Sequence, residues 1–387
     1  MQHTALSPKG FETFVANLGI KNETKDFVCI YSTVPCSAAG VFTQSSFAGA
    51  SVLLSRANIK NKQAQVIVAL SKNANVATGV QGLNDAQEII SMVAKELAVS
   101  PDDVLIASTG VIGRPYPMDK IRHGISGVLR DGLKPANFED AARGIMTTDT
   151  VAKYFSVKVG DAVLVGIAKG VGMIEPNMAT LLTFFLTDAA IEDSILDTMF
   201  RRVMDKTFNC LSIDTDTSTS DTAVILANGL AGSVDLEQFE TALEEVAIYL
   251  VRAIAKDGEG ATKLIEVTVS SARDNSQAKA IAKSIVNSPL VKTAIHGADP
   301  NWGRVAMAIG KCPDTADVQQ DKTIIKFNGM EVYPSVLDFD DLTKLEKTLH
   351  NDEIKIEVEL GIGNGSARVW GCDLSDGYVR INADYTT

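Results

Sequence analysis

The chain has 387 residues, of which 45% are hydrophobic and 22% are charged, and its formal net charge is -12. These values are typical of a globular protein with a large core, and no apolar run approaches the roughly 20 residues that a membrane helix needs. The acidic balance argues against nucleic-acid binding, which needs a basic face, and against an anionic membrane surface as partner.

The cysteines are odd in number and widely spaced, so they predict reduced thiols in a cytoplasmic protein rather than a disulfide framework. They are Cys29, Cys36, Cys210, Cys312 and Cys372. No Cys-x-x-Cys or His-x-x-x-His spacing occurs, so we expect no zinc site. The N-terminal stretch MQHTALSPKGFETF has neither a long apolar segment nor an arginine-rich amphipathic one, and it indicates no targeting signal.

The first half of the chain alternates strand and helix patterns. Alternating or β-branched apolar residues predict strands, and apolar residues at helical spacing predict helices. The predicted elements are strands at 26–43 and 64–70, a helix at 85–99, a strand at 104–107, and helices at 118–129 and 138–146. Strands at 154–159 and 162–167 then flank Gly160-Asp161, which predicts a hairpin turn.

The second half continues the alternation without a regular βαβ order. The predicted elements are helices at 191–206, 236–255, 278–286 and 341–349, and strands at 222–226, 263–270, 323–327, 330–333, 354–360, 367–372 and 378–382. Asn328-Gly329 is the strongest short hairpin signal in the chain. The pattern favours a layered α/β (α+β) fold with mixed sheets over a Rossmann fold.

The run KGVGMIEPNMATLLTFFLTD, from Lys169 to Asp188, contains the bond that we expect the chain to cut. Gly170, Gly172 and Pro176 form a loop that leads into an apolar run typical of a buried strand. A threonine at a new N-terminus has its own α-amine as base, so cutting at Ala179-Thr180 would create a nucleophile. An ordinary loop that enters a strand is the alternative.

Three polar or glycine-rich segments have two interpretations each. Ser108-Thr109-Gly110-Val111-Ile112-Gly113 would build an oxyanion hole from exposed N–H groups, or is a simple turn. The segment 214–221, rich in hydroxyls and carboxylates, would position a reactive loop or bind a cation, or is a polar turn that caps local backbone. Glu259, in Asp257-Gly258-Glu259-Gly260, would bind an ammonium group or is a solvated acid.

Taken together, these segments resemble the ornithine acetyltransferase family, which performs a glutamate N-acetyltransferase reaction in arginine biosynthesis. The resemblance extends over nearly the whole chain, and several long motifs occur in the family's order. They are STGVIG at 108–113, IMTTDT at 145–150, KGVGMIEPNMAT at 169–180, DTDTSTSDT at 214–222, DGEGATK at 257–263 and INADYTT at 381–387.

The resemblance implies a self-processing αββα sandwich with a smaller C-terminal α+β unit at about 300–387. Self-cleavage at Ala179-Thr180 would leave an α fragment, 1–179, and a β fragment, 180–387, that assemble as a heterotetramer or larger. Thr180 would accept acetyl from N-acetylornithine and pass it to glutamate, which gives ornithine and N-acetylglutamate. Thr109 and Gly110 would form the oxyanion hole, and no metal or organic cofactor is implied.

The family's substrate-binding positions match Thr147, Lys169, Thr180, Glu259, Asn382 and Thr387. Lys169 suits an α-carboxylate and Glu259 an ammonium group, because charged partners strengthen hydrogen bonds. Glu175, Thr215 and Ser220 depart from the common family pattern and resemble the branch found with clavulanic-acid biosynthesis.

Two other activities stay open at this point. One is an aminopeptidase or amide hydrolase on the same self-processing fold, with water as acceptor. The other is a non-catalytic protein that binds acidic or basic amino acids. Use of acetyl-CoA as a second donor has no clear mark in the sequence, and the choice between an arginine and a clavulanic-acid type of pathway stays open.

Overall fold

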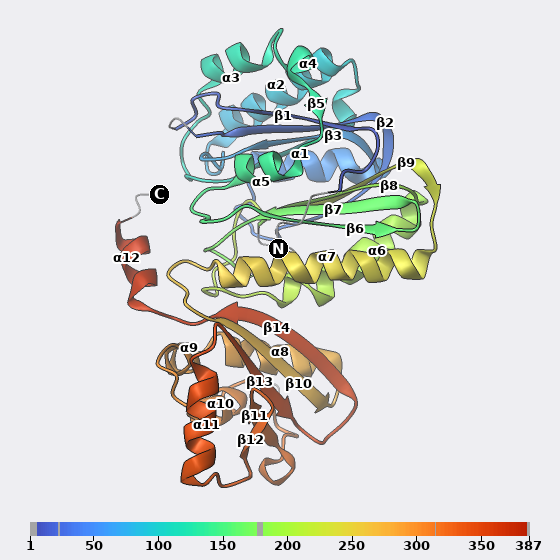
Figure 1. The fold of residues 1–387 in the computed structure, drawn as a ribbon. Helices are drawn as coiled ribbons and strands as arrows, with labels where there is room; N and C mark the ends of the chain where they lie inside the picture. Colours follow the sequence, from blue (N-terminus) through green and yellow to red (C-terminus); the bar gives the residue numbers. More distant parts are fainter. Residues whose placement is uncertain (1–5, 22–23, 176–180, 314, 385–387) are drawn as a thin grey trace.

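The protein folds into a large sandwich with a smaller sheet-containing unit below it (Figure 1). The structure is a computed structural model that describes residues 6–21, 24–175, 181–313 and 315–384. The sandwich contains a nine-stranded sheet, and the smaller unit, which we call the second unit, contains a five-stranded sheet in which β10 pairs with both β13 and β14. No helix in the described part of the chain has the length and apolar character required to cross a membrane.

One long strand, β2 (Phe27–Phe42), joins the two layers of the sandwich. Its first half pairs with β3 (Gln63–Leu70) and its second half with β9 (Thr222–Ser233). The strand order is β4-β3-β2-β9-β8-β7-β6, and β1 and β5 lie off this path. Their bounds are β1 Phe11–Ala16, β4 Val104–Ser108, β5 Lys134–Pro135, β6 Lys153–Val159, β7 Ala162–Lys169 and β8 Leu182–Ala190.

Three apolar cores separate the layers of the sandwich. One lies between the β2-β3-β4 layer and α2, α3 and α4, and a second lies between the two sheet layers. The third packs α6 and α7 under β7, β8 and β9 and continues into the second unit. The helices are α1 Ala50–Asn58, α2 Gly79–Leu97, α3 Met118–Ile125, α4 Leu129–Gly132, α5 Phe138–Ile145, α6 Asp193–Lys206 and α7 Leu236–Lys256. The expected αββα arrangement is confirmed.

The second unit has the strand order β12-β11-β13-β10-β14. Because β10 begins at Leu264, this sheet takes in residues well before the expected boundary near 300. The elements are β10 Leu264–Ala272, α8 Asn275–Val286, α9 Pro289–His296, α10 Trp302–Gly310, β11 Ile324–Phe327, β12 Met330–Tyr333, α11 Phe339–Leu349, β13 Glu353–Glu359 and β14 Gly365–Cys372. Short 3-10 helices occur at Ile59–Asn61, Pro101–Asp103, Phe208–Cys210 and Gln320–Lys322.

Most predicted elements are confirmed, and the errors have local causes. Both predicted hairpins form, and Asn328 and Gly329 have the positive φ angles, 49° and 82°, that their turn requires. The helix predicted at 118–129 is split in two, and α2 begins six residues earlier than predicted. The strand predicted at 378–382 is wrong, because these residues form α12 (Asp376–Asp384), which stands beside the sandwich in Figure 1. The elements β1, β5, α1, α9 and α10 were not predicted.

Candidate active site

The glycine-rich loop after β4 has a backbone shape that only glycine permits. Gly110 has a φ of +131°, and a Cβ there would lie 2.3 Å from the carbonyl carbon of Lys72. The residues on either side of Gly110 are hydrogen-bonded to the end of β3 and to the chain just after it. Thr109 N–H donates to Leu70 O, and Val111 N–H donates to Lys72 O. Within the described residues, the Gly110 N–H has no hydrogen-bond acceptor. It is therefore available to a ligand.

Lys169 is the last residue of β7, and its side chain connects this loop to the loop that contains Thr147. Its Nζ donates to Thr109 Oγ1 at 2.9 Å and to Thr147 Oγ1 at 3.2 Å. The side chain is buried, and burial lowers the pKa of Lys169 although Asp149 opposes the shift. Both direct partners are neutral hydroxyls, and Lys169 forms no ion pair with any residue that the structure describes. The three expected residues Thr109, Thr147 and Lys169 thus lie together.

Glu259 lies in the loop after α7, and neutral groups also hold it. Its Oε1 accepts from Thr148 Oγ1 at 3.0 Å, and its Oε2 accepts from Asn382 Nδ2 at 2.9 Å. Its N–H donates to Val171 O, which joins it to the segment after Lys169. No cation within the described parts of the chain forms an ion pair with Glu259. Asn382, predicted from the far end of the chain, reaches the site from α12.

A buried ionic triad that the sequence did not predict supports these loops. Lys153 Nζ lies 2.7 Å from Asp149 Oδ1 and 2.6 Å from Asp257 Oδ2, and all three side chains are almost fully buried. Asp149 also accepts from the N–H groups of Thr147 and Gly170, next to the two loops that Lys169 joins. Burial alone would raise the pKa of Asp149, but the ammonium groups of Lys153 and Lys169 hold it below its ordinary value.

The expected cleavage bond belongs to a stretch that the structure does not describe. Ala179, Thr180 and Thr387 lie outside the described residues. Leu181 and Leu182, which follow the bond, are described. Leu181 O accepts from Thr222 N–H at 2.8 Å, and Leu182 is the ladder partner of Lys169. Leu181, the first described residue after the expected bond, is therefore held next to the Lys169 cluster.

The polar segment at 214–221 contains a side chain that caps backbone, as the simpler interpretation predicts. Asp214 Oδ2 accepts from Met173 N–H at 2.7 Å, and its Oδ1 accepts from Ile174 N–H at 2.8 Å. Asp216 N–H also donates to Asp214 Oδ1. The carboxylate therefore orders the chain that leads toward the expected cleavage bond.

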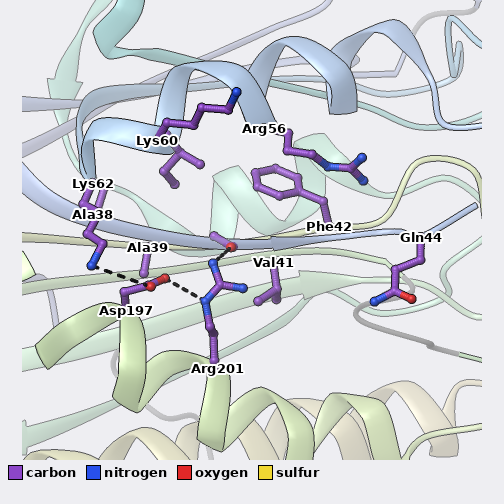
Figure 2. Close-up of a pocket in the computed structure, with 12 residues that line it drawn as sticks. Ala38, Ala39, Val41, Phe42, Gln44, Arg56, Lys60, Lys62, Asp197 and Arg201 are labelled. Atoms are coloured by element: carbon purple, nitrogen blue, oxygen red, sulfur yellow. Dashed lines mark hydrogen bonds and ion pairs between the residues drawn. The ribbon is translucent and has the colours of Figure 1, made fainter. Parts of the chain in front are cut away.

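A pocket of about 560 Å³ elsewhere on the sandwich contains none of the expected site residues (Figure 2). Phe42 in its wall is three ladder steps from Lys169, through Thr222 and Leu182, which is roughly 14 Å at the usual strand spacing. Two of its cations have partners within the protein: Arg201 donates to Asp197 and to the Gly40 carbonyl, and Lys62 lies 3.9 Å from Asp197. We therefore place the candidate site at Lys169 and Glu259.

The chain matches known proteins over nearly its whole length. The ArgJ family model matches residues 12–387. An "Arginine biosynthesis bifunctional protein ArgJ 2" from Nostoc sp. is 60% identical over 388 residues, which cover 100% of both chains. The "Glutamate N-acetyltransferase Oat2" of Streptomyces clavuligerus is 53% identical over 390 residues and 99% of both chains.

A third relative, the "Arginine biosynthesis bifunctional protein ArgJ" of Rhodococcoides fascians, is 52% identical over 387 residues, with coverage of 99% of this chain and 96% of the relative. The match is thus continuous through the sandwich, the second unit and α12, and it contains every loop of the candidate site. The chain belongs to the ArgJ family.

Proposed function

We propose that the protein is an ornithine acetyltransferase that moves acetyl from N-acetylornithine to glutamate, giving ornithine and N-acetylglutamate. One observation carries the proposal beyond family membership. Lys169 and Glu259 carry opposite charges and bond to the adjacent residues Thr147 and Thr148, and all of their side-chain hydrogen-bond partners among the described residues are neutral. An amino-acid substrate carries a carboxylate and an ammonium group, so it can pair with both.

Self-cleavage is the first step. Leu181, which follows Thr180 in the sequence, directly precedes β8. The Thr180 hydroxyl attacks the Ala179 carbonyl carbon, the peptide C–N bond breaks, and an ester joins Ala179 to Thr180 Oγ while the Thr180 amine is freed. Water then hydrolyses the ester to a carboxylate on Ala179 and a free hydroxyl on Thr180. The new α-amine, with a pKa of about 8, serves as base for the next step.

Acetyl transfer then follows in two halves. Thr180 Oγ attacks the acetyl carbonyl of N-acetylornithine, and its proton passes through the α-amine to the leaving ornithine nitrogen. Glutamate nitrogen attacks the acetyl-Thr180 ester in the second half and regenerates the hydroxyl. The Gly110 N–H and the Thr109 hydroxyl face the developing oxyanion. Because Thr109 Oγ1 accepts from Lys169, its own hydrogen is left to donate.

Binding roles follow from charge and position. Lys169 would hold the substrate α-carboxylate, with Thr147 beside it, and Glu259 would hold the side-chain ammonium of ornithine, with Asn382 orienting Glu259. Thr387 is proposed from its place in the INADYTT motif alone.

The two fragments would remain one body after the cut. β7 of the α fragment pairs with β8 of the β fragment from Leu164 to Lys169, and β2 pairs with β9. We propose further assembly to a heterotetramer or larger on family resemblance, and native mass spectrometry would count the fragments. The five described cysteines are free and buried, which supports a cytoplasmic location.

The decisive experiment is to trap the acetyl-enzyme. Denaturing mass spectrometry should first show two fragments that meet at Ala179-Thr180. Incubation with N-acetylornithine without glutamate should then add one acetyl group to Thr180, and glutamate should remove it as N-acetylglutamate. Thr180→Ala should stay uncut and unlabelled.

Two results would contradict the proposal. An intact chain with full activity would exclude the self-cleavage step, and acetate release at an unchanged rate without glutamate would indicate a hydrolase. Replacing N-acetylornithine by acetyl-CoA in the same labelling assay decides whether the protein has a second acetyl donor.

A further inference from the structure

Residues 171–175, which we call the pre-cleavage segment, connect Gly170 to the undescribed stretch with the expected cleavage bond. Besides the Asp214 carboxylate, Ile213 N–H holds this segment by donating to Ile174 O at 2.7 Å. Met173 has a φ of +55°, a conformation that side-chain-bearing residues seldom adopt without support. The contacts to residues 213 and 214 provide that support.

Glu175 ends the pre-cleavage segment, and its carboxylate has three partners. Its Oε2 accepts from Ser212 Oγ at 2.8 Å and from Asn287 Nδ2 at 2.5 Å, and its Oε1 accepts from Lys283 Nζ at 3.4 Å. Its backbone is fixed as well, because Glu175 N–H donates to Asp216 O and Thr217 Oγ1 donates to Glu175 O. Both the backbone and the side chain of Glu175 are therefore anchored.

The partners of Glu175 lie where the two units meet. Lys283 lies on α8, Asn287 caps the C-terminal end of that helix, and α8 packs on the second-unit sheet. Ser212 N–H donates to Trp370 O of β14. The chain passes close to the next residue, Gly371, where a Cβ would lie only 2.5 Å from Ser212 O. The three contacts of Glu175 form together only when the second unit is docked on the sandwich.

We infer that Glu175 is a positioning residue for self-cleavage and makes the cut depend on docking of the second unit. The inference rests on the proposed cleavage at Ala179-Thr180. Attack requires the Ala179 carbonyl carbon to stay within reach of Thr180 Oγ, and the rate of such a reaction depends steeply on how the two groups are held. Leu181 fixes the chain on one side of the bond, and Glu175 fixes it on the other.

This dependence gives the fold an order of events. The sandwich strands β7 and β8 can pair before residues 264–372 have folded, but the anchor on the α-fragment side is then missing. The nucleophile consequently forms late, in a chain whose second unit is already in place. Premature exposure of the amino-terminal threonine is avoided.

The test follows the appearance of the two fragments during cell-free translation of the full chain, on denaturing gels. Glu175→Ala should slow cleavage about ten-fold, since a hydrogen-bonded charge contributes roughly one factor of ten or more. Lys279→Ala is the matched control: Lys279 lies on the same helix but pairs with Asp205, so cleavage should keep the wild-type rate. Thermal unfolding of each variant in the uncut Thr180→Ala background separates cleavage from global stability.

A rescue makes the test specific to the contact. Asn287→Asp places a second carboxylate at hydrogen-bond distance from that of Glu175. Because like charges repel, this variant should slow cleavage as Glu175→Ala does. In the double variant Glu175→Gln/Asn287→Asp, the amide at position 175 can donate to the carboxylate at position 287. The cleavage rate should therefore return to within about three-fold of wild type.

Wild-type cleavage rates in Glu175→Ala and Asn287→Asp would overturn the inference while leaving self-cleavage intact. A slow double variant whose uncut form unfolds at the wild-type temperature would also overturn it. Failure of the wild-type chain to cut would instead refute the proposed function.

Discussion

Two loops meet at the candidate site, and they are held by different kinds of contact. The loop after β4 is fixed by backbone groups of its neighbour: Thr109 and Val111 bond to carbonyls of Leu70 and Lys72. The stretch after β7 is fixed by carboxylates that come from elsewhere in the chain, Asp149 at Gly170 and Asp214 at residues 173 and 174. The first loop needs only the pairing of β3 with β4, whereas the second needs the completed tertiary structure.

The difference predicts which substitutions each loop tolerates. A loop held by backbone contacts is insensitive to most side-chain changes and sensitive at the one position where a Cβ cannot fit. A loop held by buried carboxylates fails when a single charge is lost, because its partner is left buried and unpaired. Two substitutions and two titrations separate these cases, from the largest expected effect to the smallest.

Lys153→Met should have the largest effect on stability. It leaves Asp149 and Asp257 buried without their shared cation, and loss of one member of a buried ionic group costs about 3–5 kcal/mol of unfolding free energy. Chemical unfolding in the uncut Thr180→Ala background measures the loss. Lys158→Met is the control, since Lys158 is exposed on the same strand and should change stability by less than about 0.5 kcal/mol.

Acid provides an independent check on the same carboxylate. The folded pKa of Asp149 lies below 3.8, so its contribution to stability is complete above that pH and is lost as the pH falls through the folded value. Without Lys153, burial raises the pKa of Asp149, so the stability gap between wild type and Lys153→Met should be largest at neutral and alkaline pH and should shrink as the pH falls, first as the variant's buried carboxylate takes up a proton and then as wild-type Asp149 does. A gap that stays constant into strong acid would show that the ionic triad does not hold the second loop.

Gly110→Ala should break the first loop. The new Cβ would clash with the backbone of Lys72 and Asn73 and displace the N–H that we propose faces the oxyanion. Loss of one such donor lowers rates by about 100- to 1,000-fold, so both fragment formation and acetyl transfer should fall together. Gly113, three residues on, also has a positive φ but has open space around it. Gly113→Ala should therefore lower both rates by less than about ten-fold, through backbone strain alone.

The pH dependence of substrate binding at Lys169 should give the smallest effect. It tests the residue that joins the two loops. Because the pKa of Lys169 is lowered by burial, its ammonium loses its proton below the ordinary value of 10.5, and carboxylate binding weakens as the pH rises through that range. N-acetylglutamate has no amine that titrates there. Formation of acetyl-enzyme from N-acetylglutamate should show a KM that rises several-fold on the alkaline side, and a flat profile would argue against Lys169 as the carboxylate ligand.

The sequence by itself determined the elements whose signals are local. The Asn328-Gly329 hairpin, the amphipathic helix α7 and the buried strand β8 depend on residues only a few positions apart, and each forms as predicted. The ordered motifs also gave the family and the expected roles of Thr109, Lys169 and Glu259 before any distance was known.

Only the tertiary structure decided how distant residues meet. Lys169 bonds Thr109 across 60 positions and Glu259 bonds Asn382 across 123, and sequence order carries no such distance. The ionic triad and the partners of Glu175 depend on which charges become buried together, which no local pattern states. The strand predicted at 378–382 became α12 for a related reason: a strand needs a neighbour for its backbone groups, whereas a helix pairs them internally.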